Sequence, residues 1–239
     1  MYGTRARIGY TSPPMVTEVF PYEFYKMAPA GVTLMLTTLT LVTRSKEEVI
    51  ESFEKSLDAA RKMAKAGATV VMLGGNPISL AHGGDDLQGF QDKMSKEIGV
   101  PVLTSTMAQT KGLKLLGSRK VAVAHPYESL HNDRMAHSIT EFGFEPCGTL
   151  ACDYSMIELG TVPKEMALTL ARRLKAENPE ADTIHFGSAH WATAHVIDQV
   201  ERELGVAVMT SQQAIFWDAI RTAGIKDKIP GYGRLLSEF

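Results

Sequence analysis

An internal repeat restricts the possible folds of this chain more than any other feature of its sequence. The repeated positions, in chain order, are Pro13 with Pro126, Gly74 with Gly187, and residues 97–105 with residues 203–211. The first two pairs share an offset of 113 residues, and the two nine-residue segments are identical at six positions. Three matches in one order predict two halves of similar structure.

Short apolar segments that end at Gly or Pro predict strands buried on both faces, as in parallel sheets. The clearest such segment extends from Ala68 to Leu73 and is followed by Gly74 and Gly75. The expected strands are residues 5–11, 32–41, 68–73, 100–104, 120–124, 144–150, 181–186 and 206–209. The expected helices are residues 45–64, 85–99, 105–117, a segment ending near 142, 163–177, 193–204 and 211–222, and residues 151–162 are expected to form a loop.

This alternation of strands and helices predicts an α/β fold. We expect two pseudo-symmetric lobes, each with a parallel sheet flanked by helices. The first lobe is placed at residues 1–115 and 213–239, where the C-terminal segment returns to it, and the second at residues 116–212. Because no low-complexity linker divides the halves, we expect them to pack together, with the active site in the cleft between them.

Composition disfavours several classes of partner. The 25 basic and 27 acidic residues nearly balance and form no basic stripe, so no nucleic acid partner is expected. No apolar segment approaches the roughly 18 residues of a membrane span, so no membrane is expected either. The N-terminus lacks the pattern of a signal peptide, which favours a cytoplasmic protein. Two cysteines, Cys147 and Cys152, are too few for a disulfide framework and have poor spacing for zinc, so no metal site is expected.

The strand ends that the repeat pairs carry the candidate site residues. In chain order these are Pro13, Pro14, Gly75, Asn76, His125, Tyr127, Ser188, Ala189 and His190. If the two halves face each other, these loops converge from both sides. Helix N-termini at the same edge offer free N–H groups to an anion, which favours a small carboxylate as ligand.

Several motifs together resemble a known family. They are Ile8-Gly9 with Pro13-Pro14, Val70 to Pro77, Arg119 to Ala122 with Tyr127 and Asn132, Val206 to Ser211 with Phe216 to Ala219, and Pro230 to Leu235. In order and spacing they resemble the aspartate/glutamate racemase superfamily, and are most similar to its arylmalonate decarboxylase and maleate isomerase branch. The resemblance covers most of the chain. It implies two α/β lobes, a substrate between them, and neither a metal nor an organic cofactor.

The resemblance also implies a departure at the catalytic cysteines. In the usual member one cysteine from each lobe moves a proton at the carbon next to a carboxylate. Here those positions are Gly75, where the decarboxylase branch also has glycine, and Ser188, where it has cysteine. A thiol exchanges protons near neutral pH, whereas a serine hydroxyl needs a neighbouring base. Two-base racemisation is therefore not expected, while decarboxylation needs only one proton donor.

Other roles come from the same resemblance. Tyr127 lies where the decarboxylases have an anion-binding tyrosine, and Asn76 lies where they have a donor threonine. Backbone N–H groups near Gly75 and Ala189 would complete a pocket for an enediolate or a tetrahedral oxyanion. Pro77 replaces another hydroxyl donor, so that pocket is expected to be incomplete or differently shaped.

Histidine is the candidate for the missing proton donor or base, because it titrates near neutral pH. His190 lies two residues after Ser188 and His125 lies beside Tyr127, and for both the alternative is a hydrogen-bonded structural residue. Ser188 is either a plain hydroxyl donor or a nucleophile that one of these histidines activates, although it lacks a G-x-S-x-G context. We expect His185 to be packed in a strand, and the surface to carry His82, His131, His137 and His195.

Apolar residues hint at the shape of the substrate. Met156 and Leu159 resemble the branch's apolar pocket residues, joined by Leu39 and Leu41, with ordinary core packing as the alternative. Cys152 precedes this segment and is either a structural thiol or a displaced thiol that reaches the cleft.

The function expected first is a cofactor-independent lyase or isomerase of the decarboxylase type, which acts at the α-carbon of a small carboxylate through a stabilised enediolate. The alternative is a hydrolase of a small amide, ester or lactone that uses Ser188 or a histidine-activated water. A third possibility is an inactive protein that binds a small carboxylate. The expected partner is a small carboxylate or carbonyl compound, and a homo-oligomer is possible.

Overall fold

A computed structural model describes residues 2–42, 45–76 and 86–239 and contains two four-stranded parallel sheets. The first has the order β2-β1-β3-β4 and the second the order β6-β5-β7-β8. The strands are β1 (Ala6–Pro14), β2 (Val32–Leu41), β3 (Val70–Leu73), β4 (Val102–Thr104), β5 (Lys120–His125), β6 (Glu145–Ala151), β7 (Thr183–Phe186) and β8 (Ala207–Thr210). The α/β class with two similar parallel sheets, predicted from the repeat, is confirmed.

Equivalent hydrogen bonds follow the repeat at the ends of the central strands. The backbone N–H of Gly74 donates to the carbonyl of Thr11 over 3.1 Å, and that of Gly187 donates to the carbonyl of Ala124 over 2.8 Å. A Cβ on Gly74 would collide with the same Thr11 carbonyl. The chain therefore leaves both central strands by the same route, and one side of this route has no room for a side chain.

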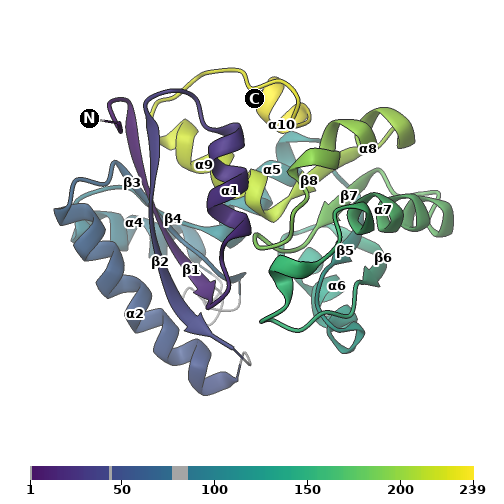
Figure 1. The fold of residues 1–239 in the computed structure, drawn as a ribbon, viewed down its shortest axis with the longest axis horizontal. Coiled ribbons are helices and arrows are strands. Elements are labelled where there is room, and N and C mark those ends of the chain that lie inside the picture. Colours follow the sequence, from purple (N-terminus) through teal and green to yellow (C-terminus); the bar gives the residue numbers. More distant parts are fainter. Residues whose placement is uncertain (1, 43–44, 77–85) are drawn as a thin grey trace.

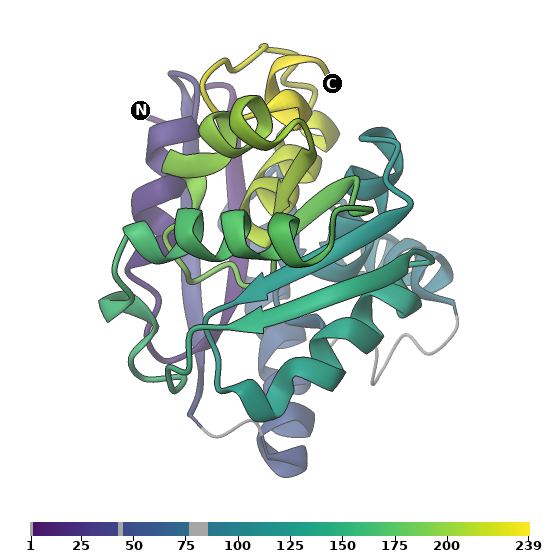
Figure 2. The same ribbon diagram turned by 90° about the vertical axis from the view of Figure 1, so that its right-hand side faces the viewer.

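Helices cover both faces of each sheet. Those before the second sheet are α1 (Val19–Met27), α2 (Lys46–Lys65), α4 (Leu87–Ile98) and α5 (Ser105–Leu115). The later ones are α6 (Asn132–Glu141), α7 (Glu165–Glu177), α8 (Ile197–Leu204), α9 (Ser211–Thr222) and α10 (Arg234–Ser237), with short 3₁₀ turns at Ser129–His131, Leu159–Thr161 and Ala194–Val196. In Figure 1 the first sheet and α2 lie at the left, and the second sheet with α6 and α7 at the right. Figure 2 shows α7, in green, in front of the second sheet.

Most predicted elements form, with local differences. The Ser45 hydroxyl accepts a hydrogen bond from the backbone N–H of Glu48 and caps α2, as its sequence pattern predicts. Helix α5 is capped by Thr104 and not by Ser105, because the Thr104 hydroxyl accepts from the N–H of Met107. Helices α1 and α10 were not predicted. In α1, Pro21 lies in the first turn, where helices tolerate proline.

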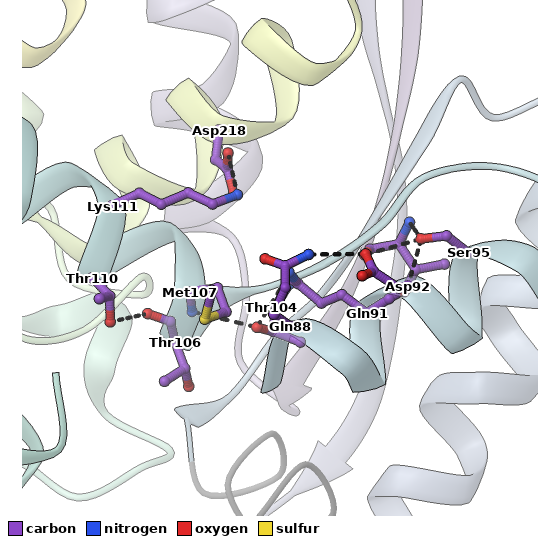
Figure 3. Close-up of polar contacts among 11 residues, drawn as sticks. Gln88, Gln91, Asp92, Ser95, Thr104, Thr106, Met107, Thr110, Lys111 and Asp218 are labelled. Carbon is purple, nitrogen blue, oxygen red and sulfur yellow. Dashed lines mark hydrogen bonds and ion pairs between the residues drawn. The ribbon is translucent and has the colours of Figure 1, made fainter. Parts of the chain in front are cut away.

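Helices α5 and α9 join the two halves. They pack against each other, and α9 also packs against β1, β3 and β4 of the first sheet. The Nζ atom of Lys111 on α5 lies 3.1 Å from both carboxylate oxygens of Asp218 on α9 (Figure 3). The largest apolar core includes residues of both sheets, among them Met72 and Val123. This packing is in keeping with the expected return of the C-terminal segment to the first lobe, and the lobe boundaries stay a prediction.

None of the helices within residues 2–42, 45–76 and 86–239 has the length and apolar character needed to cross a membrane.

Candidate active site

A cavity of about 270 Å³ lies between the two halves, beyond the carboxyl ends of their strands. Most of the candidate residues from the sequence line it, namely Pro13, Pro14, Gly75, Asn76, Tyr127, Met156, Ser188, Ala189 and His190. Leu41 also lines it, as expected for a pocket residue. The convergence of loops that lie far apart in the sequence follows from the repeated topology, since equivalent strand ends of both sheets point toward the same space.

Three candidates are placed elsewhere. His125, Leu159 and Leu39 are not among the described residues that line the cavity. Leu39 is buried in an apolar core cluster, which was the alternative for this residue. His125 is fully buried at the end of β5, where its Nε2 atom lies 2.8 Å from the Asn132 side-chain oxygen. Leu159 is buried in a 3₁₀ turn. The expectation that these three side chains line the cavity is therefore not met; Pro77 and His82 lie outside the described residues.

Ser188 is buried in the cavity wall and its Oγ atom accepts two hydrogen bonds. The Tyr127 hydroxyl donates one over 3.1 Å, and the backbone N–H of His190 donates the other over 3.1 Å. A hydroxyl oxygen has two lone pairs, so both are used and its own proton remains available for donation. Both donors would also stabilise negative charge on this oxygen.

The His190 imidazole is held by the first half of the chain. Its Nε2 atom lies 3.4 Å from the Ser12 hydroxyl, and its Nδ1 atom lies 3.4 Å from the Thr17 hydroxyl. The two hydroxyls are themselves 2.7 Å apart. The ring also lies against Tyr10, with 6.4 Å between ring centres. His190 therefore links the loop after β7 to the loop after β1 across the interface of the halves.

Asn76 is oriented by the first turns of α5. Its side-chain oxygen accepts hydrogen bonds from Ser105 over 3.1 Å and from Gln109 over 2.8 Å. The preceding residue, Gly75, has a φ of 91°, a backbone conformation that favours glycine. Since the Asn76 oxygen is occupied as an acceptor, the amide N–H₂ group is what this side chain can offer to a ligand.

The first residues of two helices lie at the cavity. Ser105 begins α5 and Ser211 begins α9, and both line the cavity at positions that the repeat relates. The Ser211 hydroxyl donates to the side-chain oxygen of Gln109 over 2.9 Å. Two helix N-termini directed at one space make its electrostatic potential favourable for an anion.

Helix α6 forms the outer part of the cavity wall. It contributes Arg134, Met135, His137, Ser138 and Glu141. Among the described residues that line the cavity, Arg134 is the one lysine or arginine, and its side chain is exposed. His137 was expected on the surface; it is indeed exposed, but at the edge of the cavity.

His185 was expected to be an ordinary packed residue and instead combines deep burial with a place in the cavity wall. Its Nδ1 atom lies 3.2 Å from the carbonyl oxygen of Met209. Burial lowers the pKa of His185 to about 4, so the ring is neutral at pH 7. Sequence reasoning missed it because a polar residue in a four-residue buried strand carries no signal of which face it occupies.

The two thiols lie outside the cavity wall. Neither Cys147 nor Cys152 is among the described residues that line the cavity, which favours the structural reading of Cys152. Burial raises the pKa of Cys147 to about 11 and that of Cys152 to about 12. Both are therefore protonated at neutral pH. Within the described ranges, no group of three or more His, Cys, Asp or Glu residues is arranged to hold a metal ion.

Comparison with known proteins agrees with this geometry. The family model for arylmalonate decarboxylase matches residues 8–236. The arylmalonate decarboxylase of Bordetella bronchiseptica is 36% identical over 233 residues, which cover 97% of this chain and 96% of that protein. A solved structure of a double mutant of arylmalonate decarboxylase in its liganded form superposes with a TM-score of 0.87 at 32% identity, covering 98% of this chain and 100% of that one.

A more distant likeness supports the fold. The maleate isomerase of Pseudomonas putida S16, solved with maleate, superposes with a TM-score of 0.85 at 19% identity and covers 97% of each chain. The relatives are lyases and isomerases, and this protein is an enzyme of that group. The chain belongs to the arylmalonate decarboxylase family.

Proposed function

We propose that this enzyme decarboxylates a small malonate-type dicarboxylic acid at its α-carbon, without a cofactor. Membership of the family supports the reaction class. The observation that carries the proposal for this chain is the Ser188 hydroxyl, which accepts from Tyr127 and from the N–H of His190 and keeps its own proton for the cavity.

The proposed reaction needs one bond to break and one to form. The bond between the α-carbon and one carboxyl group breaks, carbon dioxide leaves, and its bonding electrons remain as an enediolate on the other carboxyl group. The Ser188 proton then moves to the α-carbon. Tyr127 passes its own proton to the serine oxygen, and water at the open side of the cavity restores the tyrosine. The net change is the uptake of one proton and the release of carbon dioxide.

Several groups in the cavity can stabilise the enediolate. The Asn76 amide N–H₂ group is directed by its acceptor contacts with α5, and Ser105 and Ser211 begin helices whose N-termini favour negative charge. Preorganised donors at a developing oxyanion contribute about 3–4 kcal/mol of transition-state stabilisation each. The exposed Arg134 is placed to attract the dianionic substrate.

The hydrolase alternative requires a base for Ser188. Tyr127 donates to Ser188 and so does not serve as that base. The His190 imidazole has the Ser12 and Thr17 hydroxyls next to its ring nitrogens. We therefore keep hydrolysis as an outcome of the test and not as a second proposal.

The test is turnover of α-substituted malonates in heavy water. We expect release of carbon dioxide and one deuterium at the α-carbon of the product, with the rate strongly reduced in Ser188→Ala. Cys152→Ser serves as the matched control, because it changes a side chain outside the cavity. Hydrolysis of small esters with incorporation of oxygen from labelled water, and no decarboxylation of any malonate, would overturn the proposal.

A further inference from the structure

Most of the polar groups on the cavity floor are satisfied by one another. The Gln109 amide donates to Asn76 and to the carbonyl of Ser105, and its oxygen accepts from the Ser211 hydroxyl. These contacts fix the floor without using a ligand. A hydrogen-bond donor of a ligand finds few free acceptors there. An acceptor that is still free therefore contributes strongly to ligand recognition.

His185 supplies such an acceptor. Because the Met209 carbonyl can only accept, the Nδ1 atom of His185 must carry the ring proton. The neutral ring then has a lone pair on Nε2. No group from residues 2–42, 45–76 or 86–239 donates a hydrogen bond to this nitrogen, and the residue lines the cavity. The low pKa that burial imposes keeps the nitrogen an acceptor throughout the neutral range.

The position of His185 in β7 places this acceptor in the same cavity as the reacting groups. His185 lies within β7 (Thr183–Phe186), and Gly187 directly follows this strand; both residues line the cavity. The Met135 side chain lies directly over Gly187, where a Cβ would collide with it. Met135 and Ile215 line the cavity together with His185. The acceptor therefore shares the cavity lining with Ser188 and with these two apolar side chains, which we call the apolar wall.

We propose that His185 is a specificity-determining residue that accepts a hydrogen bond from a hydroxyl or N–H group on the α-substituent of the substrate. This inference rests on the proposed decarboxylation and adds the chemical class of the substituent. A lone pair repels a carboxylate, so the two carboxyl groups of the substrate bind toward Asn76 and the helix N-termini. The substituent then points along the apolar wall toward His185.

Two substrate pairs test this assignment in the wild-type enzyme. Each pair differs only in a hydroxyl that is replaced by a methyl group: 2-(4-hydroxyphenyl)malonate with 2-(4-methylphenyl)malonate, and 2-(2-hydroxyethyl)malonate with 2-propylmalonate. We expect kcat/KM to favour the hydroxyl compound by about tenfold or more in at least one pair, because the methyl compound leaves a buried acceptor without a donor. No preference in either pair would overturn the assignment.

Two variants separate recognition from folding. His185→Leu removes the acceptor, and the preference for the hydroxyl compound should disappear or reverse. His185→Gln retains an amide N–H for the Met209 carbonyl and an oxygen for the ligand, so the preference should survive. An unchanged preference in His185→Leu would contradict the assignment. If that variant fails to fold, the wild-type ratios and the glutamine variant still decide.

A binding measurement distinguishes failure of this inference from failure of the proposed function. If no malonate is decarboxylated, the proposed function fails, and calorimetry with 4-hydroxyphenylacetate and 4-methylphenylacetate then tests His185 alone. Tighter binding of the hydroxyl compound to the wild type but not to His185→Leu supports the assignment. Equal binding of the two acids contradicts it. Decarboxylation without discrimination rejects only the role of His185.

Discussion

The Tyr127 hydroxyl donates a hydrogen bond to the Ser188 Oγ atom over 3.1 Å, and both side chains are buried at the interface of the two halves. A tyrosine that was expected to hold the substrate's anion thus also contacts the candidate proton donor. The contact makes the serine a better acid, because negative charge left on its oxygen is stabilised by a donor already in place. The predictions below begin with this pair.

Replacement of Tyr127 by phenylalanine should lower kcat for malonate decarboxylation about 10- to 100-fold, with a small change in KM. The variant loses a hydrogen-bond donor whose main effect is to stabilise the negative charge that develops on the Ser188 oxygen as its proton leaves. The free energy of the transition state therefore rises more than that of the bound substrate. Steady-state kinetics measure both parameters. Tyr154→Phe, at a partly buried tyrosine outside the cavity, is the matched control and should retain wild-type rates. A large rise in KM with unchanged kcat would instead assign Tyr127 to substrate binding.

Replacement of Ser188 by cysteine should raise kcat, by about tenfold or more. A thiol has an ordinary pKa near 8.5, far below that of a serine hydroxyl, and so transfers its proton more readily to an enediolate. Ser188→Ala, which has no proton to give, should be the slowest of the three enzymes. The assay is carbon dioxide release under saturating substrate. A cysteine variant as slow as the alanine variant would rule out position 188 as the proton donor.

Replacement of Cys152 by serine should leave kcat within about twofold of the wild type. The thiol lies outside the cavity, and burial raises its pKa to about 12, so it carries almost no thiolate at neutral pH. For the same reason, iodoacetamide at pH 7 should modify the wild-type enzyme slowly and without loss of activity. If iodoacetamide inactivates the wild type rapidly and Cys152→Ser abolishes this inactivation, the prediction is wrong and the thiol takes part in catalysis.

Replacement of Glu23 by glutamine should stabilise the protein at pH 8 but not at pH 5. Glu23 on α1 is buried and accepts from the backbone N–H of Ala194 over 3.0 Å, which connects the two halves. Burial raises its pKa to about 7 against the opposing effects of the N–H groups of Ala194 and Thr193 and of the charges on Lys26 and Lys164.

The sign of the pH dependence follows from that raised pKa. The folded state binds more protons than the unfolded state between about pH 4.5 and 7, so the wild type loses stability as pH rises through this range. The glutamine variant lacks this loss, and its advantage at pH 8 should be about 2–3 kcal/mol. Urea unfolding at pH 5 and at pH 8 measures it. An advantage of the same size at both values would contradict the prediction.

Replacement of Lys111 by methionine should destabilise the protein by roughly 2–4 kcal/mol, because it leaves the buried carboxylate of Asp218 without its partner. Burial already raises the pKa of Asp218, and Lys111 opposes that effect. The double variant Lys111→Met, Asp218→Leu should recover most of the loss. Urea unfolding of the three proteins forms a double-mutant cycle. Additive losses would mean that the pair does not couple α5 to α9.

Local patterns explain why so much of the fold could be predicted. Buried strands require continuous apolar segments, and Gly74 and Gly187 mark the points where the chain leaves each sheet. At Gly74 the Thr11 carbonyl leaves no room for a side chain. Helix α9 begins at Ser211 and ends at Thr222, as its spacing predicts. Helices α1 and α10 escaped prediction. In α1, Pro21 lies in the first turn, where a helix tolerates proline, and Phe20 and Phe24 pack in the core.

The sequence by itself determined that there are two similar halves and which strand ends carry polar side chains. Resemblance to the family added the expectation that Ser188 stands at a cysteine position. Only the tertiary structure decided that the Tyr127 hydroxyl donates to Ser188 and that the His190 ring contacts the Ser12 hydroxyl. It also decided that His185 lines the cavity and that His125 does not. The physical reason is that spacing along a chain sets which elements form, whereas the direction of a buried side chain depends on what the opposite half places against it.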